Sequence, residues 1–283
     1  MKVVLPVLSF VLHQPGFVRH SSSALRARWF SRSSLRSSSN DEAYLTNNLK
    51  WSLYKAPYSY TNIAVVEAID IDPIIDYTLE NNLPEPFGIV TWNSSFTAAD
   101  QIDQRFSQSD ALHGKEVCDL GSGTALASLV CFSHGANVTA LDFSDISLQL
   151  GARSYAKLSE DWAAMDPPRG AVAGSGIRFV QFDMEAPEQP LPRCSLLVIS
   201  DVSYYEQLAV AVAQRAHEAI TRFDAQVLIT DPGRNTAATL LCELRRLLEP
   251  LGADFADMQF QNHAGTDSQP GYYLWLNSRR KEV

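Results

Sequence analysis

Five short apolar runs, separated by longer segments of helical pattern, restrict the fold of this 283-residue chain more than any other feature. Each run is rich in Val, Ile, Leu or Phe, which is typical of a strand buried in a parallel sheet. The runs are Lys115–Leu120, Asn137–Leu141, Ile177–Phe182, Ser195–Ser200 and Ala225–Thr230. Because strands that alternate with helices form doubly wound sheets, the pattern predicts an α/β fold with helices on both faces of the sheet.

The segments between the runs carry apolar residues at helical spacing. Leu208, Val212, Ala216 and Ile220 recur every four residues, and Leu240 to Leu248 repeats the pattern before the end of the chain. Ser144 is placed to cap a helix that continues through Leu158, whereas residues 160–176 are expected to form a long surface loop.

The end of the chain departs from the alternation. Phe255–Gln261 and Tyr272–Asn277 are predicted strands, and the polar connection His263–Gly271 between them is too short for a helical crossover. The sheet is therefore expected to end in an antiparallel pair.

The first forty residues differ from the rest. They contain six basic residues, ten serines and no Asp or Glu, which is the composition of an organelle transit peptide. Arg28-Trp29-Phe30-Ser31 resembles a mitochondrial presequence cleavage site. We expect a mitochondrial protein, with a plastid as the alternative, and a leader over residues 1–40 that is disordered and separate from the fold.

Charge and composition exclude several classes of protein. The net charge is −9, and removal of the leader leaves 17 basic against 32 acidic residues, about −15. A nucleic-acid partner is therefore not expected. No apolar run is long enough to span a membrane, so no membrane association is expected either. The four cysteines lie far apart and the six histidines show no ligand spacing, so we expect neither a disulfide framework nor a metal site.

The strongest local signal is a glycine-rich turn between a predicted strand and a predicted helix. It reads Asp119-Leu-Gly121-Ser-Gly123, and Asp142 ends the next strand, where a carboxylate can accept both hydroxyls of a ribose. The glycines would let the backbone approach a ligand closely.

A nicotinamide dinucleotide and S-adenosylmethionine could both use such a turn. Leu126 occupies the position of the third glycine in a dinucleotide fingerprint. Asp119 would repel a pyrophosphate but suits a sulfonium ligand that carries an α-ammonium group. The sequence therefore favours S-adenosylmethionine as cofactor.

Further acids follow the later strands. Asp183 or the amide of Met184 could meet an adenine, and Asp201 and Asp231 end the next two strands. Ligands of α/β sheets collect at the carboxyl ends of the strands, although any one of these aspartates could form a turn or cap a helix.

These motifs resemble those of the class I methyltransferases, and more narrowly the seven-strand family that methylates lysines of non-histone proteins. Three segments between about Pro84 and Asn277 carry the resemblance: the glycine turn at 119–123, Asp201-Val-Ser-Tyr204 as the family's D-x-x-Y motif, and the upstream segment that ends at Trp92. The resemblance implies a Rossmann-like seven-stranded sheet, mostly parallel with a terminal antiparallel pair.

The resemblance also assigns roles to residues. Asp201 and Tyr204 are implied to be catalytic, with Asp201 holding the acceptor amine and Tyr204 lining its approach. Cofactor binding is implied for Trp92, Asp119, Gly121, Gly123, Asp142, Asp183, Met184 and Asp201. Asp231-Pro-Gly-Arg234 is most like the turn of the enzyme that modifies the electron-transfer flavoprotein β subunit, which suggests that subunit as substrate.

We thus expect a monomer with a helical or lid segment over 41–110, a cofactor-binding core over 111–283, and a lysine-bearing protein as partner. Two alternatives remain open within the same fold. One is a small-molecule N-methyltransferase, and the other is a non-catalytic assembly factor.

Overall fold

A seven-stranded sheet is the centre of the fold in this computed structural model, which describes residues 48–80, 87–165, 175–252, 255, 259–261 and 271–277. The strand order is β5-β4-β3-β6-β7-β9-β8. The strands are β3 (Glu116–Leu120), β4 (Asn137–Asp142), β5 (Gly176–Gln181), β6 (Leu196–Ser200), β7 (Gln226–Asp231), β8 (Gln259–Gln261) and β9 (Gly271–Leu276).

The pairing of the strands confirms the predicted topology. The pairs β5–β4, β4–β3, β3–β6 and β6–β7 are parallel. β9 runs antiparallel to both β7 and β8. All five apolar runs become parallel strands within a residue or two of their predicted bounds, because each is a continuous apolar segment that a sheet covered on both faces can bury.

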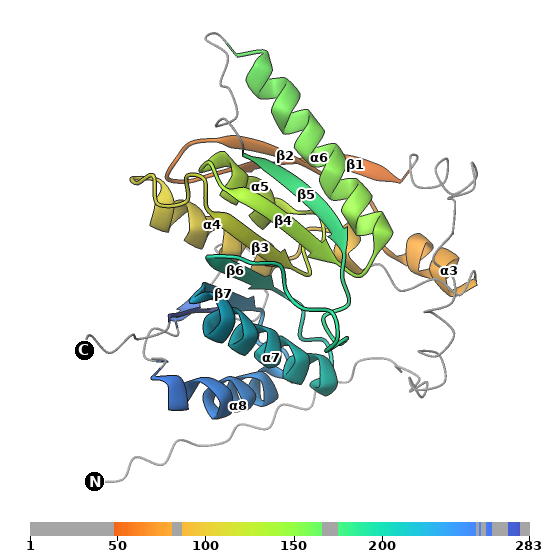
Figure 1. Cartoon of the computed structure of the whole chain (residues 1–283). Helices are drawn as coiled ribbons and strands as arrows, with labels where there is room; N and C mark the ends of the chain where they lie inside the picture. The colour runs from red at the N-terminus through yellow and green to blue at the C-terminus, as the bar shows by residue number, and fades with distance from the viewer. Residues whose placement is uncertain are drawn as a thin grey trace. The chain divides into compact units, whose positions relative to one another are not determined.

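Helices pack on both faces of the sheet (Figure 1). One face, with Val117, Val138 and Val198, packs in a core with α4 (Asn93–Phe106), α5 (Leu126–Ser133) and α6 (Asp145–Ala163). The other face, with Leu120 and Leu197, packs against α7 (Glu206–Phe223) and α8 (Ala237–Leu248). Successive residues of a strand point to opposite faces, so each buried strand supplies both cores.

The segment expected to be helical or a lid over 41–110 begins differently. β1 (Leu49–Lys55) and β2 (Asn62–Ala68) form a separate antiparallel hairpin before α3 (Asp72–Glu80), the 3₁₀ turn η1 (Phe87–Ile89) and α4. The hairpin is attached to α6, where the backbone N–H of Val66 donates to Ser154 Oγ at 2.9 Å. The helical prediction is therefore wrong for 49–55 and 62–68, which are strands, and the β-branched Ile63, Val65 and Val66 of β2 are buried.

α6 is capped as predicted but is longer than predicted. The Ser144 hydroxyl accepts a hydrogen bond from the N–H of Ser147, and the helix continues to Ala163. Residues 160–163 are therefore helical rather than part of the expected loop, since Trp162 is buried against Phe132 at a ring distance of 5.3 Å. Residues 166–174 of that loop and the whole leader, residues 1–40, lie outside the described residues.

Candidate functional site

Five aspartates lie at or just beyond the carboxyl ends of the five neighbouring parallel strands. Asp119 and Asp142 belong to β3 and β4, Asp183 follows β5, Asp201 follows β6, and Asp231 ends β7. Parallel strands all end at one edge of the sheet, so the topology brings the predicted residues to that edge.

The glycine turn is closely packed against other parts of the chain. Gly121 has φ +74°, and a Cβ there would lie 2.2 Å from Val202 Cγ1. Gly123 has φ +51° and lies against Gly88, whose own Cβ would be 2.8 Å from Gly123 Cα. The expected reason for the glycines was close approach to a ligand. The structure adds a different one, because protein atoms already fill the space of both side chains.

Asp119 is buried, and the start of α5 fixes its carboxylate. Its Oδ2 accepts hydrogen bonds from the Ser128 hydroxyl at 2.6 Å and from the Ser128 N–H at 3.1 Å. Burial raises the pKa of Asp119 to about 6, although the two bonds from Ser128 favour the ionised form. Asp119 is therefore an oriented carboxylate that loses its charge in mildly acidic solution.

Asp142 ties the glycine turn to the end of β4. Its Oδ2 accepts from the N–H of Gly123 at 2.8 Å, and its Oδ1 accepts from the N–H of Ser144 at 2.9 Å. Burial raises its pKa, and these backbone donors act in the opposite direction. Each oxygen keeps a second lone pair, so a carboxylate held this way can still accept a pair of hydroxyls.

The segment that contains Trp92 lies beside the glycine turn. Trp92 Nε1 donates to the carbonyl of Phe87 at 2.8 Å, which closes this segment on itself. The Thr91 N–H donates to buried Glu67 at 2.8 Å, and the hydroxyls of Thr91 and Thr124 are 2.9 Å apart. The structure thus brings the Trp92 segment and the glycine turn together, and β2 supports the contact through Glu67.

Asp183 forms a turn. Its Oδ1 accepts from the N–H of Glu185 at 2.9 Å, while its own N–H donates to Gln189 Oε1 at 3.1 Å. The Met184 side chain reaches the glycine turn, where its Cε would lie 3.6 Å from a Cβ on Gly121. The Met184 side chain therefore adjoins the turn, and the backbone just before Asp183 adjoins Asp142, whose carbonyl accepts from the N–H of Phe182 at 2.9 Å.

Asp201 is buried and engaged by an arginine. Arg234 Nε and Nη2 both contact Asp201 Oδ1, at 2.8 and 2.5 Å. Burial raises the pKa of Asp201, and the charge and hydrogen bonds of Arg234 lower it part of the way back. Asp201 also has φ +57°, a left-handed conformation that Asp tolerates better than most residues.

The turn at 231–234 positions that arginine. Asp231 Oδ1 accepts from the N–H groups of Gly233 and Arg234, at 2.8 and 2.9 Å, and its Oδ2 accepts from the Ser203 hydroxyl at 2.6 Å. Asp231 therefore connects the loops after β6 and β7, and it fixes the backbone from which Arg234 reaches Asp201.

Tyr204 covers the ion pair. The Arg234 guanidinium lies 4.6 Å from the centre of its ring, and the ring of Phe87 is 5.5 Å away on a tilted plane. Burial raises the pKa of the Tyr204 hydroxyl. The side chain of neighbouring Tyr205 has a different partner, since its hydroxyl donates to Glu185 at 2.6 Å.

The structure brings all the predicted site residues to the carboxyl edge of the sheet or to the segment beside it. Sequence reasoning missed Arg234 as a partner of Asp201, although the turn that contains it had been singled out. It also missed Arg215 of α7, a buried arginine that contacts the segment after β5. The available signal was a charged residue on the apolar stripe formed by Leu208, Val212 and Ile220.

Two further properties concern metals and membranes. Within the described ranges, no three His, Cys, Asp or Glu side chains gather where they could hold a metal ion. Among the helices of the described residues, none has the length and apolar character needed to cross a bilayer.

Comparison with family models finds no match, and comparison with curated proteins finds none either. Solved structures do match. The 16S rRNA N2 G1207 methyltransferase RsmC of Thermus thermophilus, solved with AdoMet and guanosine, superposes with a TM-score of 0.50 at 12% identity. That match covers 82% of this chain and 51% of RsmC.

Two further solved structures are similar. A protein of Streptococcus mutans described as a SAM-dependent methyltransferase has a TM-score of 0.50 at 12% identity, over 80% of this chain and 55% of that one. The magnesium protoporphyrin IX methyltransferase of Synechocystis, solved with SAH, has a TM-score of 0.49 at 16% identity, over 72% and 97%. With the strand order, the matches to RsmC and to the Streptococcus mutans protein show that the chain has the Rossmann-like fold of the S-adenosylmethionine-dependent methyltransferases.

Proposed function

We propose that the protein is an S-adenosylmethionine-dependent methyltransferase that modifies lysine side chains of a mitochondrial protein, with the electron-transfer flavoprotein β subunit as the first candidate. The observation that carries the proposal is the set of oriented carboxylates at one edge of the sheet: Asp119 and Asp142 beside the glycine turn, and Asp201 after β6. This set offers partners for a cofactor on one side and for an amine on the other.

The residues beside the glycine turn fit S-adenosylmethionine. Asp119 is an anion suited to an α-ammonium group, and Asp142 is suited to the ribose hydroxyls. Ser122 Oγ, in the turn itself, is buried and has no hydrogen-bond partner among the described residues, so a polar ligand group could satisfy it. RsmC and the Synechocystis enzyme are both solved with this cofactor or its demethylated product.

When bound, S-adenosylmethionine supplies a methyl group that its sulfonium makes electrophilic. The task of the protein is then to orient a neutral amine, and orientation accounts for much of the rate of such displacements. Lysine has an ordinary pKa near about 10.4, so the amine must lose its proton before it reacts.

Asp201 is the group proposed to orient the amine. Both Arg234 contacts fall on Oδ1, so Oδ2 is the oxygen available to accept a hydrogen bond from the acceptor. Arg234 keeps this oxygen in one place and favours its ionised form. The ring of Tyr204, which is 36% exposed, lies over the pair and would border the approach of the lysine.

Charge and sequence support a protein acceptor. The chain without its leader carries about −15, which favours a lysine-bearing partner over nucleic acid. The D-x-x-Y motif at 201–204 and the Asp-Pro-Gly-Arg turn form one connected cluster through Asp231, and both motifs carry the resemblance to the lysine methyltransferases. The acid-free leader supports a mitochondrial location.

Mass spectrometry after incubation with S-adenosylmethionine tests the proposal. The purified β subunit and a mitochondrial extract are the acceptors, and we expect methyl groups on lysine side chains. The proposal assigns Asp201 to the amine and not, as the resemblance implied, also to the cofactor, so Asp201→Asn should abolish the product while it binds S-adenosylhomocysteine nearly as the wild type does. The exposed Asp110→Asn is the matched control. Methyl groups found only on small molecules, or full activity in Asp201→Asn, would contradict the proposal.

The location has its own experiment. Residues 1–40 fused to a fluorescent protein should direct it to mitochondria, whereas a fusion that starts at Asn40 should not. Uniform cytosolic fluorescence of the first fusion would contradict the mitochondrial assignment, and plastid fluorescence would move the search for a substrate to that organelle.

A further inference from the structure

The segment between β5 and β6 connects two strands without a helix in its described residues, although helices connect β3 to β4, β4 to β5 and β6 to β7. This segment contains Asp183 and Met184, and the Met184 side chain lies beside the glycine turn. A connection that lacks a helix of its own depends on neighbouring elements for its backbone hydrogen bonds.

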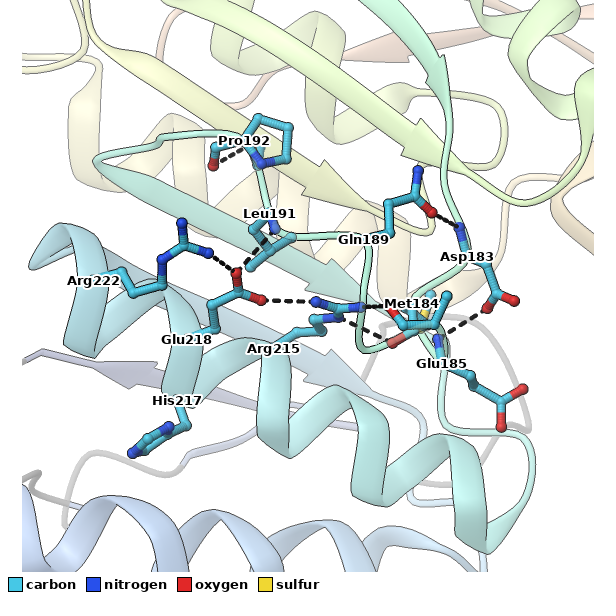
Figure 2. A network of polar contacts seen from close by, with 12 residues as sticks. Asp183, Met184, Glu185, Gln189, Leu191, Pro192, Arg215, His217, Glu218 and Arg222 are labelled. Atoms are coloured by element: carbon cyan, nitrogen blue, oxygen red, sulfur yellow. Dashed lines mark hydrogen bonds and ion pairs between the residues drawn. The ribbon is translucent and has the colours of Figure 1, made fainter.

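Arg215 of α7 supplies several of those bonds. Its Nε donates to the carbonyl of Met184 at 3.0 Å (Figure 2), and its Nη2 donates to the carbonyl of Ala186. Its guanidinium also lies 5.1 Å from the ring centre of Phe182. The residue is 5% exposed, so this cation is almost fully withdrawn from water.

Glu218, one turn further along α7, completes the attachment. Its Oε2 pairs with Arg215 Nη1 at 2.8 Å, and its Oε1 accepts from the N–H of Leu191 at 3.0 Å. The charges and hydrogen bonds around it hold the pKa of Glu218 below its ordinary value in spite of burial. The two residues therefore bind both ends of the segment to one helix, as Figure 2 shows.

The peptide group between Met184 and Glu185 is held from two sides. Its carbonyl points to Arg215, and its N–H donates to Asp183 Oδ1 at 2.9 Å. The C=O and N–H of a trans peptide point in opposite directions, so the Asp183 carboxylate lies on the side away from α7. Arg215 thereby sets the plane of this peptide group, which follows the residue whose side chain lies beside the glycine turn.

We propose that Arg215 is a positioning residue for the adenine end of the cofactor, because it fixes the backbone of Asp183 and Met184 against which the base would lie. This inference rests on the proposed function. It assigns Arg215 no contact with the cofactor, and its effect passes through the Met184 and Ala186 carbonyls.

Calorimetric titration of the full chain with two ligands tests the inference. S-adenosylhomocysteine carries both adenosine and the amino acid, whereas 5′-methylthioadenosine carries only the adenosine. Arg215→Met should weaken the binding of both ligands by the same factor, about tenfold, the scale of one misplaced hydrogen bond to the base. The affinities of Arg215→Lys should lie between those of the wild type and Arg215→Met, because lysine keeps the charge but cannot reach both carbonyls and Glu218.

Arg222→Met is the matched control on the same helix. Arg222 also pairs with Glu218, but its side chain is 50% exposed and makes no contact with the carbonyls of the segment. The affinities of Arg222→Met for the two ligands should stay within about twofold of the wild-type values, because exposed ion pairs contribute little. If Arg215→Met does not fold, the same comparison is made with Arg215→Lys.

The outcomes separate this inference from the proposed function. A wild-type protein that binds neither ligand overturns the proposed function itself. Wild-type binding with unchanged affinities in folded Arg215 variants overturns only the inference, even if their melting temperature falls. A loss for S-adenosylhomocysteine alone also overturns it, because the effect would then belong to the amino-acid end.

Discussion

Replacement of Arg234 by methionine should destabilise the protein in a way that depends on pH. The variant removes the cation that contacts Asp201 Oδ1 at 2.5 and 2.8 Å, while Asp201 itself remains only 3% exposed. Loss of one partner of a buried ion pair costs about 3–5 kcal/mol, because the other charge is left without compensation. The Arg234 side chain is 29% exposed, so we expect the lower end, about 3 kcal/mol, at neutral pH.

The sign of the pH dependence follows from Asp201. Burial already raises its pKa, and Arg234 opposes that rise, so removal of Arg234 raises the pKa further. An acid whose pKa is higher in the folded than in the unfolded protein stabilises the fold at low pH and loses that contribution as the pH rises. The deficit of Arg234→Met should therefore be smallest near pH 4 and should grow toward pH 7.5.

Urea unfolding at several pH values measures this deficit, and a double-mutant cycle with Asp201→Asn isolates the pair. In the Asp201→Asn background, Arg234→Met should cost about 1 kcal/mol or less, since no uncompensated carboxylate remains. The exposed Arg246, which pairs with Glu243, provides the control, and Arg246→Met should leave the free energy of unfolding almost unchanged. A deficit that is equal at pH 4 and pH 7.5, or a coupling free energy near zero, would refute the reasoning.

Three other changes have defined outcomes. Gly121→Ala should destabilise the protein by more than about 2 kcal/mol in thermal unfolding, because its Cβ would meet Val202 Cγ1 at 2.2 Å, and Val202→Ala should restore part of the loss. The affinity for S-adenosylhomocysteine should fall about tenfold between pH 7 and pH 5 as Asp119 gains a proton at its pKa of about 6, and calorimetry of Asp119→Asn should show no such change. The free energy of unfolding of Tyr204→Phe should lie within about 0.5 kcal/mol of the wild-type value, because the ring that faces Arg234 is retained. The free energy of unfolding of Tyr204→Ala should be lower by about 0.5–1 kcal/mol.

The sheet could be predicted from the sequence because its strands are continuous apolar runs. β6, for example, is Leu-Leu-Val-Ile-Ser and is buried throughout, so no other assignment suits it. The β1–β2 hairpin could not be predicted in the same way. Trp51 and Leu53 are 53% and 71% exposed, so apolar residues occupy the outer side of β1, and its pattern does not distinguish its two faces.

The arrangement around the glycine turn could also be predicted from the sequence, because Asp119, Gly121 and Gly123 are neighbours in the chain. The contacts of Asp201 could not be predicted from the sequence. Arg234 is 33 positions away and reaches Asp201 only because β6 and β7 pair and Asp231 fixes the turn. Arg215 is similar, since its partners are backbone carbonyls, which no sequence pattern reveals.

Calorimetric titration of the wild type and Asp142→Ala with S-adenosylhomocysteine measures whether the site binds this cofactor. In the proposed site the cofactor lies at the carboxyl edge of the sheet, with Asp142 as the acceptor for its ribose. Hydrogen bonds to a charged group contribute about 1.5–3 kcal/mol each, so the wild type should bind and Asp142→Ala should bind at least about tenfold more weakly. A wild type that releases no heat of binding, or an Asp142→Ala variant with unchanged affinity, would contradict the account.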